Sequence, residues 1–240
     1  MNTTIALAGN PNSGKTTLFN QLTGARRHVG NYPGVTVEKK EGTYSHNGHK
    51  TRVVDLPGTY SLTAYSVEEL VARNFIINDV PTAVIDIVDA SNLERNLYLA
   101  IQFMEMGIPV CIALNMIDVA KSRGIEIDAE KLSELLGVPV VPTIARRGKG
   151  KDDLMLKAIH MGDERPTPLW ISFGPDVDST LLELEKEIQA EGFLQDTYPA
   201  RWVALKYLEK DEQILKMGKE SNPDLAERLE TAVETLSEHL

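Results

Sequence analysis

Short apolar runs alternate with helical patterns along the first two thirds of the chain. Five runs rich in Val and Ile are typical of buried strands: Ile5–Ala8, Thr51–Asp55, Ala83–Asp89, Val110–Asn115 and Val138–Val141. Between them, apolar residues recur every three or four positions at 18–24, 67–78, 93–107, 129–137 and 153–159, which predicts helices. The alternation predicts an α/β fold. Its mostly parallel sheet of six to seven strands has helices on both faces and binds ligands at the carboxyl ends of the strands.

One polar stretch, residues 42–50, departs from this alternation. It contains Asn47-Gly48, a pair that favours the tight turn of a β-hairpin. We therefore expect the strand before this turn to run antiparallel, at an edge of the sheet.

The last third of the chain has a purely helical pattern. Apolar residues at helical spacing predict three helices at 180–192, 200–218 and 223–240, the first two ending at Gly192 and Gly218. The Pro-containing stretch 162–170 marks a boundary. We predict one domain over 1–165 and a small all-α domain over 166–240. We interpret the carboxylate pair Glu183 and Glu187 as part of a solvated helix face.

Charge divides the chain at the same place. Residues 1–162 hold 17 basic and 17 acidic residues, whereas residues 163–240 hold 8 basic and 18 acidic ones. An acidic appended domain argues against a nucleic-acid partner, because phosphate binding needs clustered Lys and Arg. No apolar run is long enough to predict a membrane span. Cys111, the single cysteine, lies in an apolar run and favours a buried thiol in a reducing compartment.

The segment GNPNSGKT, residues 9–16, links the first predicted strand to the first helix. Its spacing is that of the phosphate-binding loop, in which backbone N–H groups and a helix N-terminus surround phosphate. We expect phosphate contacts from Asn12, Ser13, Gly14, Lys15, Thr16 and Thr17, with the Thr16 hydroxyl on Mg²⁺.

Three further motifs follow later strands in a consistent order. Asp55 and Gly58 of DLPG are placed to hold Mg²⁺ through water and to contact a third phosphate. Asn115, Met116 and Asp118 of NMID offer a carboxylate to the two N–H donors of guanine, which adenine lacks. Thr143, Ile144 and Ala145 of TIAR bring a backbone N–H toward guanine O6. Together these motifs predict a P-loop GTPase domain that binds GTP and GDP.

The chain resembles a particular GTPase family. GNPNSGKTTLFN, NYPGVTVEKKEG (31–42), DLPGTYSL and NMIDVA, followed by an acidic helical segment, are similar to the cytoplasmic region of ferrous iron transport protein B. The resemblance covers essentially the whole chain and implies a membrane transport domain for Fe²⁺ in the same polypeptide, so we expect this chain to be part of a longer protein. It further implies a location at the cytoplasmic face of a bacterial membrane and small cytosolic accessory proteins as partners, and it is compatible with a homo-oligomer.

The resemblance also bears on catalysis. Thr59 occupies the position where many GTPases have a catalytic glutamine, so that function must come from elsewhere. The resemblance implies that Asn12 coordinates K⁺ in place of an arginine finger, against the simpler reading that Asn12 only favours the turn. Thr36 would be the switch threonine that binds Mg²⁺ and the third phosphate, with Gly34 and Val35 beside it in a loop ordered by GTP.

Several points qualify this prediction. Met116 and Ile144 stand where Lys and Ser are frequent, so we expect modest nucleotide affinity and fast GDP release. We assign Asn10 only to the turn and His28 to a solvated position. The competing hypotheses are a soluble ribosome- or tRNA-associated GTPase and a nucleotide-gated switch with negligible turnover.

Overall fold

The computed structural model describes residues 3–24, 27–63, 65–163 and 166–239. The chain divides into two compact units. The first comprises Met1–Met104 and Ile108–Thr167, and the second Glu105–Gly107 and Pro168–Leu240. Among the residues described, no helix is long and apolar enough to cross a membrane.

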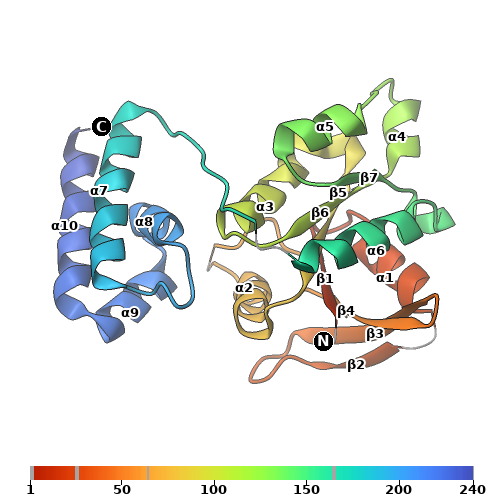
Figure 1. Ribbon diagram of the computed structural model, residues 1–240, viewed down its shortest axis with the longest axis horizontal. Helices are drawn as coiled ribbons and strands as arrows, with labels where there is room; N and C mark the ends of the chain where they lie inside the picture. The colour runs from red at the N-terminus through yellow and green to blue at the C-terminus, as the bar shows by residue number, and fades with distance from the viewer. Residues whose placement is uncertain (1–2, 25–26, 64, 164–165, 240) are drawn as a thin grey trace. The chain divides into compact units, whose positions relative to one another are not determined.

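The first unit is built on one seven-stranded sheet (Figure 1). The strand order is β2-β3-β4-β1-β5-β6-β7. Pairing is parallel from β4 through β7, and β3 runs antiparallel to both β2 and β4. The predicted sheet is therefore confirmed, with strands β1 Thr4–Gly9, β2 Arg27–Asn31, β3 Glu38–His46, β4 His49–Asp55, β5 Ala83–Asp89, β6 Val110–Asn115 and β7 Val140–Pro142.

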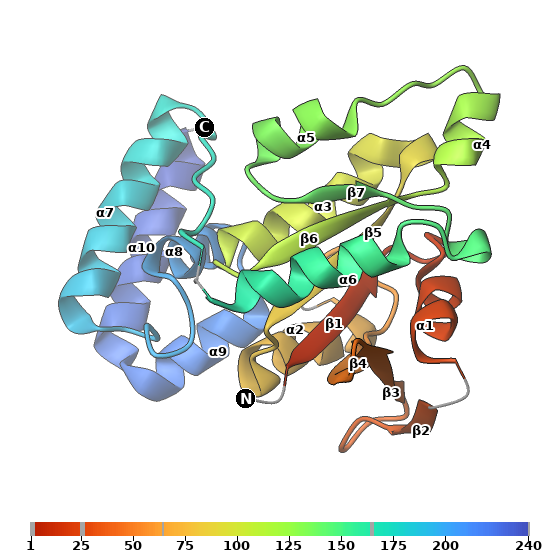
Figure 2. The same ribbon diagram turned by 45° about the vertical axis from the view of Figure 1, so that its right-hand side comes forward.

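Helices cover both faces of this sheet, as the alternation predicts (Figure 2). One face carries α1 and α6, and the other carries α2 and α3. The helices of the first unit are α1 Lys15–Thr23, α2 Val67–Asp79, α3 Leu93–Glu105, α4 Ile117–Ser122, α5 Ala129–Leu136 and α6 Lys151–His160. The short α4 is absent from the sequence prediction, because six residues are too few to show a helical period.

The strand pattern explains the core. Alternate residues of a strand point to opposite faces, so odd-numbered positions such as Ile5, Leu7 and Ile85 pack with Leu18 of α1 and Leu154 of α6 in one cluster. All five side chains are fully buried. Each contributes about 1.5–3 kcal/mol to the free energy of unfolding. This packing fixes where the strand ends lie.

The hairpin prediction is right in direction and wrong in position. Asn47 and Gly48 have φ of 48° and 81°, as the tight turn between β3 and β4 requires. However, β3 is not at the edge, because β2 pairs with its outer side through residues 27–31. The sequence pattern predicts no strand for the segment 27–31. Its polar sequence RHVGN lacks an alternating pattern, and backbone pairing to β3 makes it a strand.

Over its described residues, the second unit has four helices rather than the expected three: α7 Pro175–Glu191, α8 Ala200–Leu208, α9 Glu212–Ser221 and α10 Pro223–His239. The predicted single helix over 200–218 is wrong. Lys210 takes a left-handed φ of 54°, and the Asp211 side chain accepts the Ile214 N–H at 3.0 Å to begin α9. Gly192 ends α7 as expected, at φ 62°.

The expected role of Gly218 is also wrong. Gly218 lies buried inside α9, where an added Cβ would collide with the Tyr207 hydroxyl and lie 2.9 Å from Phe193 Cζ. Its small size therefore serves packing between helices rather than helix termination.

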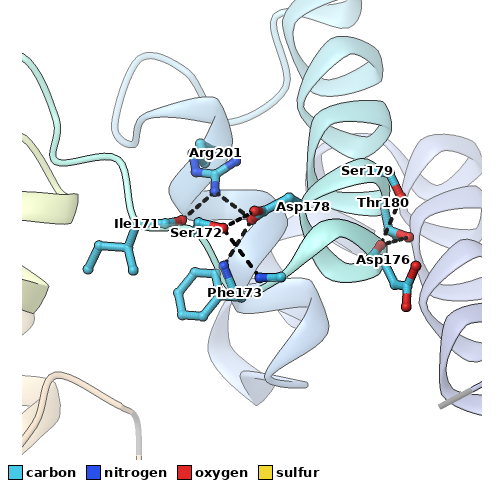
Figure 3. Close-up of polar contacts among 9 residues, drawn as sticks. Ile171, Ser172, Phe173, Asp176, Asp178, Ser179, Thr180 and Arg201 are labelled. Carbon is cyan, nitrogen blue, oxygen red and sulfur yellow. Dashed lines mark hydrogen bonds and ion pairs between the residues drawn. The ribbon is translucent and has the colours of Figure 1, made fainter.

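A polar cluster holds residues 171–174 against the second unit's own helices (Figure 3). Arg201 of α8 donates to the Ile171 carbonyl at 2.8 Å and pairs with the Asp178 carboxylate at 3.4 Å. Asp178 also accepts the Phe173 N–H at 3.1 Å and the Ser172 hydroxyl. Donation from Ser172 and Phe173, together with Arg201, holds the pKa of Asp178 below its usual value. These contacts fix the start of α7.

Candidate functional site

The expected site residues follow strands that all end at one edge of the sheet. Strands β1, β4, β6 and β7 are mutually parallel through their neighbours, so their carboxyl ends lie together. Gly9, Asp55 and Asn115 are the last residues of β1, β4 and β6, and Thr143 comes directly after β7. This is the edge where open α/β sheets bind ligands.

The loop after β1 has the backbone that its glycines and asparagines predict. Gly14 has φ 97° and Asn12 has φ 69°, a region that Gly and Asn reach at low cost. A Cβ at Gly9 would lie 2.8 Å from the Ile87 carbonyl oxygen, and one at Gly14 would collide with the Asn115 amide. The loop is therefore packed too closely for any side chain at either glycine, and α1 begins directly after it, at Lys15.

Lys15 reaches across the loop to the end of β4. Its Nζ lies 2.5 Å from Asp55 Oδ1, and the two side chains are only 11% and 5% exposed. Burial raises the pKa of Asp55, and the neighbouring Lys15 charge opposes that shift. The pair brings together the expected phosphate and Mg²⁺ residues, whereas the Thr16 and Thr17 side chains, one and two residues on, face solvent.

Gly58 lies against the phosphate loop. An added Cβ there would contact Pro11 Cα at 3.5 Å, so the backbones of the two loops run close together. Thr59, the next residue, is 5% exposed.

Asn115 connects three loops. Its Nδ2 donates to the Ser13 carbonyl at 2.8 Å, and its Oδ1 accepts the Ala145 N–H at 2.9 Å. The Thr143 hydroxyl donates to the same oxygen at 3.5 Å. The phosphate loop and both segments expected to hold guanine are thus joined through one buried amide. The Ala145 N–H is already engaged here, so a guanine O6 would share it with Asn115.

Asp118 lies in the first turn of α4, which Met116 introduces with a left-handed φ of 59°. The Asp118 carboxylate forms an ion pair with the Arg146 guanidinium. Desolvation raises the pKa of Asp118, but the hydrogen bond and charge of Arg146, together with backbone hydrogen bonds, outweigh it and hold the pKa below the usual value. Ile144 is buried, and Ala145–Arg147 form a short 3-10 helix that presents Arg146 to Asp118.

The expected switch segment forms a turn between β2 and β3. The Tyr32 N–H donates to the Val37 carbonyl at 2.9 Å, and the Val35 N–H donates to the Tyr32 carbonyl at 3.3 Å. Gly34 takes φ 76° within this turn, and Thr36 is exposed. Buried Tyr32 anchors the turn by packing edge-on against Phe75 of α2.

The sequence reasoning missed three polar residues of this unit. Asn10, assigned only to the turn, is buried and donates to the Arg95 carbonyl in the first turn of α3 at 3.4 Å. Arg146 received no role, because its pairing with a residue 28 positions away is not visible in the sequence. Asp86 of β5 is 1% exposed, neither of its carboxylate oxygens has a hydrogen-bond partner among the residues described, and burial raises its pKa to about 8. An Asp within an apolar run was the available signal.

Two expectations outside the site agree with the structure. Cys111 is fully buried in β6, and burial raises the pKa of its thiol to about 12. The His28 side chain faces solvent. Among the residues described, no group of three or more His, Cys, Asp or Glu is arranged to hold a metal ion.

Comparison with known families gives two matches. Residues 3–158 match the family described as ferrous iron transport protein B, and residues 173–240 match the FeoB cytosolic helical domain. A fusion protein of Fe(2+) transport protein A and the Fe(2+) transporter FeoB from Porphyromonas gingivalis is 46% identical over 214 residues. FeoB of Salmonella typhimurium is also 46% identical over 214 residues. These alignments cover 88% and 87% of this chain but only 25% and 27% of the relatives, so the chain spans about a quarter of their length.

Solved structures agree with the fold. A mutant of S. thermophilus NFeoB bound to mGDP has a TM-score of 0.89 at 39% identity and covers 99% of this chain and 90% of its own. The cytosolic domain of T. maritima FeoB in its GMPPNP form has a TM-score of 0.83 at 35% identity and covers 99% and 98%. Guanine nucleotides are therefore seen on close structural relatives of this site.

Proposed function

The chain belongs to the FeoB family of ferrous iron transport proteins, and from that premise we propose that it binds GTP and GDP and hydrolyses GTP. It comprises the G domain and the cytosolic helical domain of that family. The observation that carries the proposal is the amide of Asn115, which joins the phosphate loop at Ser13 to the base-recognition segment at Ala145. One rigid edge of the sheet then offers a phosphate cradle and a guanine-selective carboxylate, Asp118, at the same time.

For the phosphates, we assign Lys15 and the backbone N–H groups of the loop and of the first turn of α1, from Asn12 to Thr17. Lys15 exchanges its Asp55 partner for the terminal phosphates. Thr16, Thr36 and Asp55 would hold Mg²⁺, and the buried carboxylate of Asp55 suits a hard cation with oxygen ligands. Mg²⁺ at this position would neutralise charge on the phosphates.

For catalysis, we assign Asn12, Lys15, Thr36 and the Gly58 N–H. Hydrolysis requires positive charge near the bridging oxygen of the phosphates and an oriented water. The side chain of Asn12, within the phosphate loop, is exposed, and we propose that its amide oxygen holds K⁺ there. The K⁺ charge would serve where other GTPases use an arginine finger. The Gly34–Thr36 turn would close over the third phosphate.

We further propose that GTP hydrolysis regulates or drives Fe²⁺ uptake through a membrane domain of the same polypeptide, at the cytoplasmic face of a bacterial membrane. The curated relatives are transporters about four times as long as the matched region. The relative fused to Fe(2+) transport protein A supports a small accessory protein as a partner. We place the domain boundary near residue 166.

The test is a change of base specificity. Asp118→Asn should lower GTP binding by about a hundredfold or more, because the amide offers a donor where guanine needs an acceptor. The same variant should gain affinity for xanthosine triphosphate, which has an oxygen at that position. Gain of binding shows that the variant is folded. Unchanged preference for GTP over xanthosine triphosphate would exclude the proposed guanine site.

A further inference from the structure

We propose that Arg146 competes with guanine for the Asp118 carboxylate and thereby lowers the apparent affinity of this chain for guanine nucleotides. The inference rests on the proposed function, since it concerns the same base-recognition site. It gives Arg146, the last residue of the TIAR motif, a role in setting nucleotide affinity.

The first argument is the contact itself. An Nη2 of Arg146 donates to Oδ2 of Asp118, across 28 residues of sequence. The two residues come from different segments, since Asp118 lies in α4 and Arg146 in the 3-10 helix after β7. Both segments are fixed to Asn115, because Asn115 immediately precedes Met116 and accepts the Ala145 N–H. The framework that positions Asp118 for guanine therefore also positions Arg146 for Asp118.

The second argument is that guanine and the Arg146 guanidinium would use the same acceptor, the Asp118 carboxylate. Guanine presents two parallel N–H donors, and a carboxylate recognises them by accepting one hydrogen bond on each oxygen. A guanidinium presents the same arrangement of donors to the same acceptors. Arg146 already donates to Oδ2, one of the two oxygens that guanine would use, so the guanidinium and guanine compete for that acceptor.

The third argument concerns exposure. The Arg146 side chain is 65% exposed, and that of Asp118 is 22% exposed. Arg146 can therefore swing into solvent without creating a buried unpaired charge, and the pair it breaks is of the weak, screened kind. The competition is consequently mild and reversible, so it reduces affinity without blocking the site.

The size of the effect follows from population arithmetic. Apparent affinity falls by the fraction of molecules in which Asp118 is free of Arg146. An exposed ion pair shifts that fraction by about two- to fivefold. Because the pair is already broken in the nucleotide complex, the loss lies mainly in the rate of association.

The experiment compares Arg146→Ala with Arg147→Ala. Arg147 is the next residue in the same 3-10 helix and is also exposed, so its removal makes the same change in net charge without touching Asp118. The readouts are the equilibrium dissociation constant for fluorescently labelled GDP and the association rate by stopped flow, at low and at high salt.

We expect Arg146→Ala to bind GDP about two- to fivefold more tightly than the wild type at low salt, with a smaller gain at high salt. We expect Arg147→Ala to match the wild type or to change much less. Equal or weaker binding by Arg146→Ala, or the same gain in both variants, would overturn the competition. Failure of the wild-type chain to bind GDP at all would instead overturn the proposed function.

A second background separates competition from a general effect of charge. In Asp118→Asn, which has no carboxylate for Arg146 to hold, adding Arg146→Ala should leave the affinity for xanthosine diphosphate unchanged. A gain of the same size in that background would show that Arg146 acts by long-range repulsion or local loosening, and would also overturn the proposal.

Discussion

Two carboxylates at the same sheet edge, Asp55 and Asp118, are each paired with a basic residue, yet they differ in almost every physical respect. Asp55 and its partner Lys15 are nearly buried, at 5% and 11% exposure. Asp118 and Arg146 are 22% and 65% exposed. The pKa of Asp55 is raised by burial, while that of Asp118 is held down by Arg146.

The difference shows that one proposed site can contain a buried ion pair at its phosphate end and an exposed ion pair at its base end. A buried charge depends on its partner, because removing one member leaves the other desolvated and unpaired. An exposed pair can open freely, since water takes over both charges. At the proposed phosphate end, the Lys15–Asp55 pair would therefore open only when phosphate and Mg²⁺ replace both partners, whereas at the proposed base end the Asp118–Arg146 pair can open to water. Removing the two cations should have opposite effects on nucleotide binding.

The largest expected effect is at the phosphate end. Lys15→Met should lower the rate of GTP hydrolysis by about 10²–10³-fold, because it removes a charge that stabilises the reacting phosphates. It should also raise the pKa of Asp55 further, since the main opposing charge is gone. Phosphate release under saturating GTP is the measurement, with Lys50→Met on the exposed hairpin as a matched control. A Lys15→Met rate near that of the wild type would show that Lys15 does not stabilise the reacting phosphates.

The next effect concerns Asn12, within the phosphate loop. GTP hydrolysis should be at least about tenfold faster in K⁺ than in Na⁺, because the smaller ion fits the proposed oxygen ligands less well. Asn12→Ala should remove that dependence and leave GDP binding largely intact. Hydrolysis assays in matched chloride salts test this, and equal wild-type rates in both salts would contradict it.

Asp86 provides a third carboxylate for the comparison, one for which the described part of the chain shows no hydrogen bond or ion pair. Its folded-state pKa of about 8 lies above the ordinary value of 3.8, so its stabilising contribution is complete below that value and is lost as pH rises toward 8. Asp86→Asn should melt close to the wild type near pH 4 and about 5 °C or more above it at pH 8. Thermal melts across this range decide, and parallel curves would mean that Asp86 has found a partner.

The smallest effect is on stability at the base end. Arg146→Ala should change the melting temperature by less than about 2 °C at pH 7, because the pair is exposed. The pKa of Asp118 in the folded state is below its ordinary value of 3.8. The contribution of the pair to the melting temperature is therefore present above pH 3.8 and is lost as pH falls through the lowered pKa of Asp118. A large loss of melting temperature would show that the pair supports the fold.

Much of the fold could be predicted because its signals are local. The Val- and Ile-rich runs gave five strands, and the order of the motifs after them identified the edge that carries the site. Where the prediction failed, a local signal was weak or misread. Asp211 followed by a helical pattern is a helix-start signature that would have divided 200–218 correctly.

Other features depend on tertiary contacts and could not have been predicted. The strand β2 has no apolar alternation and exists through its backbone pairing with β3. Gly218 resembled a helix terminator, but the space it leaves is filled by Tyr207 from another helix. The motifs identified Lys15, Asp55 and Asp118 as candidates, whereas the role of Arg146 shows only in the structure, where the 3-10 helix after β7 lies next to the first turn of α4.

The bridge made by Asn115 has one further consequence. Because the single amide of Asn115 joins the loops that would hold the two ends of a nucleotide, the relative position of those loops is set by the fold itself. We then expect ordering on nucleotide binding to concentrate at Gly34 and Thr36, exposed residues of the β2–β3 turn, because buried Tyr32 anchors the start of that turn against Phe75. A conformational change that passes from this domain to another part of the protein would then begin at the exposed residues of that turn.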